Sequence, residues 1–463
     1  MILRASFCRI VCTSCVGAQG SRAFRGFVRG SYRPFEIRLD ALESDLDCGN
    51  HTGQVLLHSS SGLILVCYLQ WHVRYLLLRR HLDRCRYQKY KRPITMLQIL
   101  LSATFISLLG GMCLIHFRHL HEGFSADHDL GGVQKFHAHP VPRIGGVPIA
   151  LGLVVGCGFL AWSLNDLKIL LILIVALPAF IVGILEDVTK KVGPLPRLLA
   201  TFAAAALGYF ILGAGLQRLD IPLVDSLLSQ VWLLSLLLTI VAVGGVAHAV
   251  NIIDGYNGLS GVVSIFIFLA MAYVAFKVQD VALMGLSFAM VGAIAGFLFW
   301  NFPRGLIFAG DGGAYLVGFM IAEVAVLLVA RHPQVSPWFP LLCVIYPVFE
   351  TLYSIYRKKF LRGMSPGMPD GLHLHMLVYK RLVRWMVGSK DASHLTMRNS
   401  LTSPYLWALS SVSVVPAMLF WQHTGVLMVF CALFAASYIY LYRMIIRFRT
   451  PRWLVLRRGC RLR

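Results

Sequence analysis

The feature that most restricts the fold of this chain is a succession of apolar stretches long enough to cross a lipid bilayer. A spanning helix needs about 20 predominantly apolar residues. Eleven stretches after residue 95 approach that length: 97–117, 146–164, 168–185, 198–216, 231–249, 259–276, 281–300, 314–330, 338–356, 404–420 and 425–442. Only 14% of the 463 residues are charged, whereas soluble domains carry about 25%. The sequence therefore predicts an all-α, polytopic integral membrane protein with about eleven transmembrane helices.

The basic residues are distributed unequally between the two sides of the predicted membrane. The loops after the odd-numbered stretches, together with the C-terminal tail, hold 24 Lys and Arg residues. The opposite side holds 4, counting Lys168 at the edge of its stretch. Because cytoplasmic loops carry the excess of Lys and Arg, we place the odd-numbered loops and the tail in the cytoplasm. The net charge of +22 then needs no nucleic acid partner.

Residues 1–95 differ from the rest of the chain. They hold 15 Lys and Arg against 6 acids and show no sustained periodicity. Their most apolar stretch, 62–78, is interrupted by His72 and Arg74, so it is either a weak extra helix or outside the native protein. Because Met96 directly precedes the first good stretch, we expect translation to begin there. We divide the chain into an atypical basic segment 1–95, a membrane domain 96–445 and a basic cytoplasmic tail 446–463.

Polar clusters interrupt the apolar pattern, and all of them fall on the same predicted side. They follow stretches one, three, five, seven and nine, and they comprise residues 135–146, 186–197, 251–258, 301–313 and 357–384. Polar groups at the edge of a membrane are costly and usually functional. Acids and histidines scattered for solubility would not segregate in this way. We therefore expect the clusters to form one active site in the cytoplasmic loops.

The residue types in these clusters point to a phosphorylated substrate and a metal. The acids are Glu186, Asp187, Asp254 and Asp311. The cations and donors suited to phosphate are Lys135, Arg143, Arg197, Arg304, His373 and His375. Carboxylates are the oxygen ligands that Mg²⁺ combines with substrate phosphates and water. Together with glycine turns that let backbone approach a ligand, this composition predicts metal-dependent chemistry on a phosphorylated substrate.

Several of these residues also have ordinary structural interpretations. Asp187 can be the acid of a capped helix end, and a Gly-Asp-Gly-Gly sequence is often only a turn. The i, i+3 spacing of Asn251, Asp254 and Asn257 would place them on one helical side, and there we favour function. His373 and His375 are two residues apart, which implies loop or extended backbone. The cysteines show no metal-binding or disulfide pattern.

The sequence motifs in these clusters resemble those of a known family, the polyprenyl-phosphate N-acetylhexosamine-1-phosphate transferases. The resemblance covers about residues 97–445 and rests on five ordered motifs. These are Pro-Arg-Ile-Gly-Gly-Val-Pro at 142–148 after Lys135, Gly-Ile-Leu-Glu-Asp at 183–187 before Arg197, Asn-Ile-Ile-Asp-Gly-Tyr-Asn-Gly-Leu at 251–259, Gly-Asp-Gly-Gly at 310–313, and His-Leu-His at 373–375. The last motif is similar to that of the branch that initiates O-antigen and related surface polysaccharides.

The resemblance implies a bacterial inner-membrane enzyme with a cytoplasmic active site. Its substrates would be a UDP-N-acetylhexosamine and undecaprenyl or another polyprenyl phosphate, its cofactor Mg²⁺ or Mn²⁺, and its released product UMP. The implied metal ligand is Asp311, and the implied catalytic acids are Glu186, Asp187 and Asp254. The implied substrate-binding residues are Lys135, Arg143, Arg197, Asn251, Asn257, His373 and His375.

The chain departs from the family pattern at two positions and leaves some alternatives open. Glu186 stands where the family usually has a first aspartate, and Asn257 stands where many members have an acid, so residue 257 cannot be a base. If a general base is used, Asp187 is the candidate. The sequence does not identify the sugar, whose selection we expect in 357–403. The alternatives are the phospho-N-acetylmuramoyl-pentapeptide transferase of peptidoglycan synthesis and an ion-coupled transporter.

The distribution of Lys and Arg predicts the orientation of the C-terminus. A green fluorescent protein fused after Arg463 should fluoresce, and alkaline phosphatase at the same position should be inactive, because both would remain in the cytoplasm. A fusion active only as periplasmic alkaline phosphatase would contradict the orientation.

Overall fold

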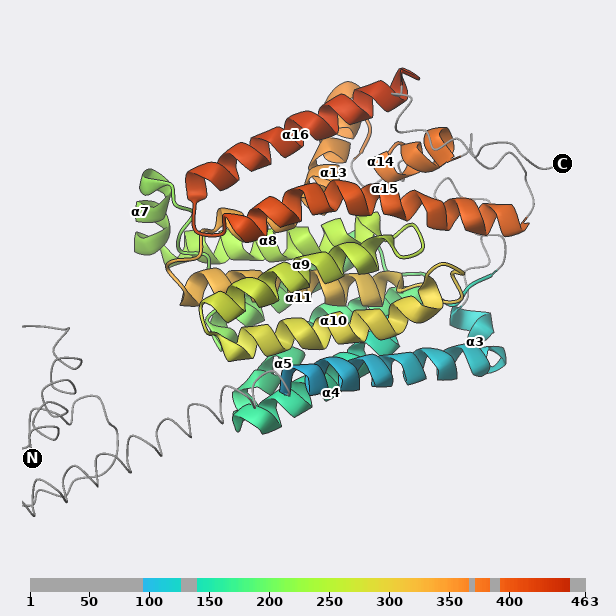
Figure 1. The fold of residues 1–463 in the computed structure, drawn as a ribbon, viewed down its shortest axis with the longest axis horizontal. Helices are drawn as coiled ribbons and strands as arrows, with labels where there is room; N and C mark the ends of the chain where they lie inside the picture. The colour runs from blue at the N-terminus through green and yellow to red at the C-terminus, as the bar shows by residue number, and fades with distance from the viewer. Residues whose placement is uncertain (1–94, 126–139, 366–370, 384–391, 450–463) are drawn as a thin grey trace, which may run out of the picture. The chain divides into compact units, whose positions relative to one another are not determined.

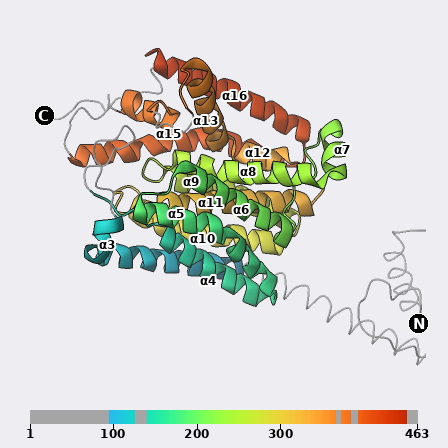
Figure 2. The ribbon, with the colours of Figure 1, turned by 180° about the vertical axis from the view of Figure 1, so that it is seen from behind.

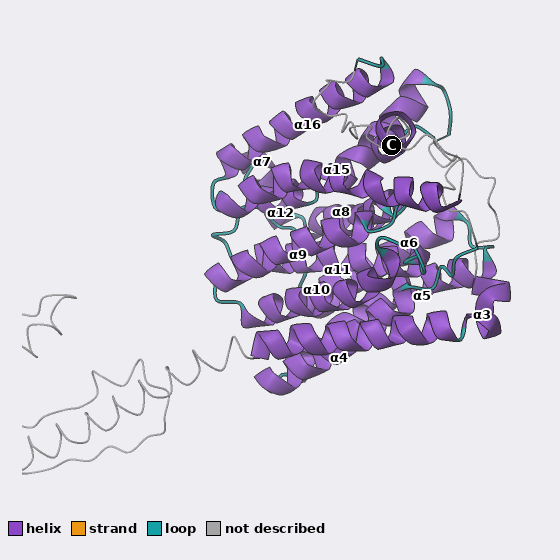
Figure 3. Cartoon of the chain, turned by 45° about the vertical axis from the view of Figure 1, so that its right-hand side comes forward, coloured by secondary structure: helices purple, strands orange, loops and turns teal. Residues whose placement is uncertain are grey.

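The computed structural model describes residues 95–125, 140–365, 371–383 and 392–449. These residues belong to the second of two units of the chain, Tyr90–Arg463. Within the described segments there are helices and connecting loops but no β-strand, as Figure 3 shows. The predicted all-α fold is therefore confirmed for this part of the chain. The predictions about residues 1–94, Lys135 and residues 450–463 lie outside the described residues.

Nine helices within the described segments are long and apolar enough to cross a membrane. They are Thr95–His116, α4 (Gly146–Leu164), η2 with α5 (Leu167–Thr189), α6 with η3 (Pro194–Leu212), α8 (Trp232–Ile253), α9 (Leu259–Lys277), α10 (Val281–Asn301), α11 (Gly310–Arg331) and α16 (Thr424–Ile446). Each contains one of the stretches predicted from the sequence or overlaps most of it. The chain is thus a multi-pass membrane protein.

Two of the eleven predicted stretches are not among these nine helices. The stretch 338–356 is divided at Val344 into α12 (Trp338–Cys343) and α13 (Ile345–Tyr356). Pro347 has no backbone N–H to donate to the carbonyl four residues earlier, and this interrupts the helix. In Figure 1, α13 crosses the direction of the neighbouring long helices. The stretch 404–420 lies within the longer helix α15 (Ala392–Leu419).

The segment 357–403, predicted as a loop, is largely helical where it is described. It contains the π-helical turns η4 (Arg357–Leu361) and η5 (Val378–Leu382), the short helix α14 (Leu374–Leu377) and the first turns of α15. The reason is that Leu374, Leu377 and Leu382 are buried in the core, so the segment packs instead of extending into water. Two further short helices are α3 (Arg118–Ser125) and α7 (Pro222–Gln230).

Helix α11 is the central element of the bundle. Its sequence is apolar on all sides, which is typical of a helix surrounded by other helices, and every residue from Gly310 to Val329 is buried. Helices α4, α5, α8 and α9 pack against it. Figures 1 and 2 show α9 and α10 on one side of α11 and α5 and α6 on the other. The position of α11 therefore depends on all its neighbours.

Glycines allow α4 and α5 to contact the start of α11 backbone to backbone. A Cβ atom at Gly183 of α5 would lie 2.5 Å from both the Cα and the backbone nitrogen of Gly312. A Cβ atom at Gly146, the first residue of α4, would collide with the backbone of Gly313. Backbone atoms cannot move aside as the end of a flexible side chain can, so a larger residue would separate these helices.

This close packing predicts that Gly183→Ala destabilises the protein. Overpacking a core typically costs about 1–3 kcal/mol, so the midpoint of thermal unfolding in detergent should fall. Gly158→Ala in α4 is the matched control, because a Cβ there has no atom within 4 Å and alanine favours a helix over glycine. Equal unfolding midpoints for the two variants would contradict the packing argument.

Candidate active site

A carboxylate from another helix caps the first turn of α11. Asp187, near the end of α5, is fully buried. Its Oδ1 accepts a hydrogen bond from the backbone N–H of Asp311 and its Oδ2 from that of Gly312, both at 2.8 Å. The first amides of a helix have no partner inside the helix, and negative charge is favourable at that end. Asp187 therefore fixes the start of α11 against α5.

The residue that precedes this turn adopts a conformation suited to glycine. Gly310 has a φ of +70°, in the left-handed region where a side chain is disfavoured. A Cβ atom there would also collide with the backbone oxygen of Arg143. The Gly-Asp-Gly-Gly sequence is thus both a tight connection and the first turn of a buried helix.

Asp311 is the centre of a cluster of polar side chains. Its carboxylate forms ion pairs with Arg197 and, at 3.4 Å, with Arg143. The amide of Asn251 donates a hydrogen bond to its Oδ1 at 3.1 Å. Arg143 also lies 3.8 Å from Asp187. Two guanidinium groups therefore surround acids that come from two different helices.

Backbone hydrogen bonds place Arg143 beside this cluster. The N–H of Phe308 donates to the carbonyl of Pro142, and the N–H of Gly145 donates to the carbonyl of Phe308, both at 2.9 Å. The N–H of Gly146 donates to the carbonyl of Ala309 at 2.8 Å. The segment before α4 and the segment before α11 are thus held together just where each helix begins.

The segment 251–258 does not form one helical side, so that prediction is wrong. Helix α8 ends at Ile253, and Asp254 already has a non-helical backbone, because glycines follow at 255 and 258. The Asp254 carboxylate accepts a hydrogen bond from the Ser260 hydroxyl. Burial raises the pKa of Asp254 to about 7, and the hydrogen bond from Ser260 opposes that shift. Burial therefore favours the neutral form of this carboxyl group more than in an exposed aspartate.

Asn257 is held by α15 instead of by α8. Its backbone N–H donates to the side chain of Asn399 at 2.7 Å, and its side-chain amide donates to the carbonyl of Pro303 at 3.1 Å. Its carbonyl accepts from Ser403 at 2.6 Å. The polar beginning of α15, which the sequence analysis assigned to a loop, thus fixes the turn that follows α8.

The two histidines lie together beside this turn. His373 has extended backbone at the start of α14, as its spacing predicted, whereas His375 lies inside the helix. Their rings are stacked, with centroids 5.2 Å apart and planes 6° from parallel. The rings of His375 and Tyr256 are in a T-shaped arrangement with their centroids 5.5 Å apart. Both histidines are buried, so they are not solvated surface residues.

A cavity of about 300 Å³ brings most of the predicted residues together. Among the residues lining it are Arg143, Asn251, Asp254, Asn257, Asp311, His373 and His375. They come from four of the five predicted polar clusters, which are separated in the sequence but converge in the fold. Arg197 does not line the cavity but contacts it through its ion pair with Asp311.

Two predicted catalytic acids do not line this cavity. Asp187 lies behind it, with both oxygens accepting hydrogen bonds from the start of α11. The neighbouring Glu186 accepts a hydrogen bond from the backbone N–H of Val192 at 2.7 Å and so closes the turn after α5. The adjacent acids of the sequence motif therefore have different contacts.

Several residues of the site were not predicted from the sequence. Phe308, Tyr256 and Asn399 all line the cavity. A signal was available for Phe308, which lies three residues before Asp311 in a cluster already singled out. Asn399 gave no signal, because its role depends on a contact with a segment 142 residues away.

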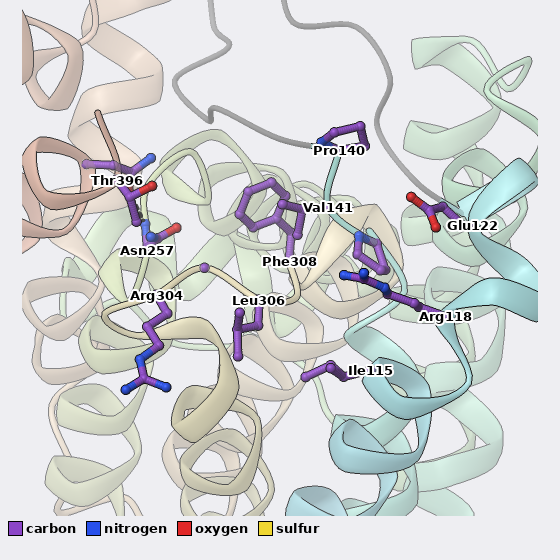
Figure 4. A pocket seen from close by; sticks show the side chains of 13 residues that line it. Ile115, Arg118, Glu122, Pro140, Val141, Asn257, Arg304, Leu306, Phe308 and Thr396 are labelled. Atoms are coloured by element: carbon purple, nitrogen blue, oxygen red, sulfur yellow. Dashed lines mark hydrogen bonds between the residues drawn. The ribbon is translucent and has the colours of Figure 1, made fainter. Parts of the chain in front are cut away.

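A second cavity, of about 240 Å³, adjoins the first and shares Asn257, Phe308 and Asn399 with it. Figure 4 shows Phe308 in the middle of its wall, with Asn257 on one side and Arg118 on the other. Arg304 and Leu306 complete the lower part of the wall in this view. An aromatic ring, amides and guanidinium groups thus border two neighbouring cavities.

The donor set suits a metal that shares its ligands with a substrate. Within the described segments, no three acids, histidines or cysteines gather into a complete metal-binding cluster. Mg²⁺ does not need one, because it is commonly bound by one or two carboxylates together with substrate phosphates and water. Asp311 and Asp254 line the same cavity, and their oxygen chemistry fits this mode of binding.

Part of the chain is similar in sequence to known proteins. The sequence model of glycosyl transferase family 4 matches residues 169–329. A probable undecaprenyl-phosphate N-acetylglucosaminyl 1-phosphate transferase of Bacillus subtilis is 28% identical over 249 residues, which are 52% of this chain and 66% of that protein. The decaprenyl-phosphate N-acetylglucosaminephosphotransferase of Mycobacterium tuberculosis is 28% identical over 277 residues, 52% of this chain and 65% of its own length.

A third relative is shorter in its match but somewhat more similar. The undecaprenyl-phosphate alpha-N-acetylglucosaminyl 1-phosphate transferase of Escherichia coli K12 is 31% identical over 149 residues, 31% of this chain and 40% of that protein. The chain thus spans slightly less than two-thirds of the length of the first two relatives. The family match includes Asp187, Asn251, Asp254 and Asp311, and over this part of its length the chain is similar to glycosyl transferase family 4 and to polyprenyl-phosphate N-acetylglucosamine-1-phosphate transferases.

Proposed function

We propose that this protein transfers N-acetylglucosamine 1-phosphate from UDP-N-acetylglucosamine to a polyprenyl phosphate and releases UMP. The single observation that carries the proposal is the convergence of Arg143, Asp254, Asp311 and two histidines on one cavity at the ends of membrane helices. The relatives are named as N-acetylglucosaminyl or N-acetylglucosamine phosphotransferases, which supports this sugar over the other N-acetylhexosamines.

The cationic and donor side chains of the cavity would bind the diphosphate of the nucleotide sugar. Arg143 and Arg197 already contact Asp311, and arginine binds phosphate oxygens in a bidentate manner. His373 and His375 lie on the wall formed by the 371–383 segment, where their rings can donate to phosphate oxygens. Lys135 remains a predicted phosphate ligand that lies outside the described residues.

The acids of the cavity would hold Mg²⁺, with Asp311 as the main ligand and Asp254 as the second. When bound, the metal supplies positive charge that offsets the charge of the diphosphate and of the departing UMP. In phosphoryl transfer the protein acts mainly by positioning and by electrostatic stabilisation. The asparagine at 251, which donates to Asp311, would orient this carboxylate.

The second cavity offers space for the nucleoside. The Phe308 ring can stack on a flat base, and the Asn257 and Asn399 side chains can form hydrogen bonds with its edge. Since both cavities share these three residues, a nucleotide could place its base in one and its diphosphate in the other. This arrangement supports a nucleotide-linked sugar over a free sugar phosphate.

The reaction itself needs little proton transfer. An oxygen of the polyprenyl phosphate attacks the β-phosphorus of the UDP-sugar, the bond from that phosphorus to the bridging oxygen breaks, and UMP leaves with the bonding electrons. The attacking phosphate is already anionic at neutral pH, so a general base is not essential. The hydrogen bonds of Asp187 to two backbone amides favour a positioning role for this acid over a role as base.

The membrane setting suits a lipid acceptor. The described helices can hold the enzyme in the bilayer, and the cavity lies where several of these helices end. A polyprenyl chain could therefore stay in the lipid while its phosphate reaches the cavity. We place the enzyme in the bacterial inner membrane with this cavity on the cytoplasmic side, as the distribution of Lys and Arg predicts, at the start of a surface polysaccharide pathway.

An assay with the purified full-length chain tests the proposed function. The detergent-solubilised protein is incubated with undecaprenyl phosphate, Mg²⁺ and one of three donors: UDP-N-acetylglucosamine, UDP-N-acetylgalactosamine or UDP-N-acetylmuramoyl pentapeptide. We expect UMP and a lipid diphospho-sugar with the first donor, both detectable by mass spectrometry. Preference for the pentapeptide donor would favour the peptidoglycan reaction, and absence of UMP with all three would contradict a transferase function.

The polar cluster predicts a large effect of Asp311→Asn. The substitution keeps the size of the side chain but removes its charge, so turnover should fall by about 100-fold or more, as when other preorganised electrostatic groups are removed. Asp166→Asn is the control, because Asp166 is exposed and is not part of either cavity. Turnover of Asp311→Asn close to that of the control would refute the role assigned to Asp311.

A further inference from the structure

Glu350 of α13 is a buried acid that lies outside the polar clusters of the sequence. It lies within a stretch predicted to span the membrane, and it is only 1% exposed. Its Oε1 accepts hydrogen bonds from Nδ1 of His373 at 2.9 Å and from the backbone N–H of Leu374 at 3.0 Å. Its Oε2 accepts a hydrogen bond from the hydroxyl of Tyr438 at 2.8 Å.

These three hydrogen bonds explain how the fold tolerates the acid. A buried carboxylate without partners is strongly unfavourable, whereas hydrogen bonds to a charged group are stronger than those between neutral groups. Here the donors come from the His373 ring, from the start of α14 and from α16. Glu350 is therefore fixed from several directions and cannot turn away without losing at least one partner.

The contact with Glu350 determines which nitrogen of His373 remains for a ligand. A carboxylate only accepts hydrogen bonds, so Nδ1 must carry the hydrogen that it donates to Glu350. The other ring nitrogen, Nε2, is then left for a group in the cavity that His373 lines. Stacking on His375 further restricts rotation of the ring.

Helix α16 contributes to this arrangement from a distant part of the sequence. Tyr438 donates to Glu350, and one turn later the hydroxyl of Tyr442 donates to the carbonyl of Leu372 at 3.1 Å. Arg357 donates to the same Tyr442 hydroxyl at 2.7 Å. The residues before α14 are thus held by two tyrosines that lie well beyond the part of the chain matched by the family, residues 169–329.

We propose that Glu350 is a positioning residue that holds His373 with its Nε2 directed toward the diphosphate of the nucleotide sugar, and that Tyr438 supports Glu350 in this role. The inference rests on the proposed function, because the diphosphate is the ligand that His373 would contact. Glu350 does not itself touch the substrate. It acts through His373, so its effect on the reaction should disappear when the His373 ring is absent.

A double-mutant cycle tests this dependence. Wild type, Glu350→Gln, His373→Ala and the double variant are purified, and two quantities are measured for each: the rate of UMP release and the affinity for UDP by isothermal titration calorimetry. We expect Glu350→Gln to lower both at least about tenfold, because the amide can turn its NH₂ toward Nδ1 and disturb the ring. In the His373→Ala background the same change should alter both quantities less than about twofold.

Control variants separate positioning from general loss of structure. Glu323→Gln in α11 also removes a fully buried carboxyl group, but it lies outside both cavities and should leave UDP affinity unchanged. Tyr438→Phe should give a smaller loss than Glu350→Gln, again absent without the His373 ring. It replaces Glu350→Gln in the cycle if that variant does not fold.

The results distinguish this inference from the proposed function. Equal effects of Glu350→Gln with and without His373, or no effect in either background, would overturn the positioning role even if the wild type is an active transferase. Wild-type protein that binds UDP but releases no UMP would contradict the proposed function, while the affinities would still decide the role of Glu350. Failure of the wild type to bind UDP would overturn both.

Discussion

The contact between the Asp187 carboxylate and the first amides of α11 is the constraint on which the site depends. It joins the end of α5 to the start of the most buried helix, and it uses both oxygens of the acid. The approach requires glycine at residue 183, because a Cβ there would meet the backbone of Asp311 and Gly312. Once α11 begins at this point, Asp311 faces Arg143, Arg197 and Asn251.

The charges around Asp311 suggest how the site recognises its substrate. The buried carboxylate of Asp311, which lines the cavity, is paired with two guanidinium groups, while the Asp187 carboxylate accepts hydrogen bonds from backbone amides. A ligand that brings both a divalent cation and phosphate groups would satisfy this set, because the cation can bind Asp311 while the arginines bind phosphate oxygens. When the ligand binds, contacts with the ligand would replace the ion pairs of Asp311 with Arg143 and Arg197. None of these charged groups would then be buried without a partner.

Much of the fold followed from local patterns in the sequence. The nine long helices correspond to apolar stretches, and the convergence of polar clusters followed from their positions after alternate stretches. Pro347 could have indicated the break between α12 and α13. The continuous apolar character of 338–356 instead led to the prediction of one helix. The helical structure of 371–383 could not be read, since it depends on packing of Leu374 and Leu377 against the core.

The site was less predictable where function depends on contacts between distant segments. Asp187 and Glu186 form one motif in the sequence, yet their hydrogen-bond partners differ. Glu350 lies in an apolar stretch and gave no periodic signal, and its partners are 23 to 88 residues away in the sequence. Asn257 was read as part of a helical side, although its contacts are with α15. Only the folded structure brings these pairs together.

The most direct test of this account measures metal binding when the cap of α11 is weakened. Mn²⁺ is titrated into wild-type protein and Asp187→Asn in the presence of UDP-N-acetylglucosamine, and bound metal is followed by electron paramagnetic resonance. In the proposed function Asp311 binds the metal and Asp187 only positions Asp311. The account therefore predicts folded protein whose Mn²⁺ affinity is at least about tenfold lower, as for other residues that orient a ligand. Unchanged Mn²⁺ affinity in Asp187→Asn would contradict it.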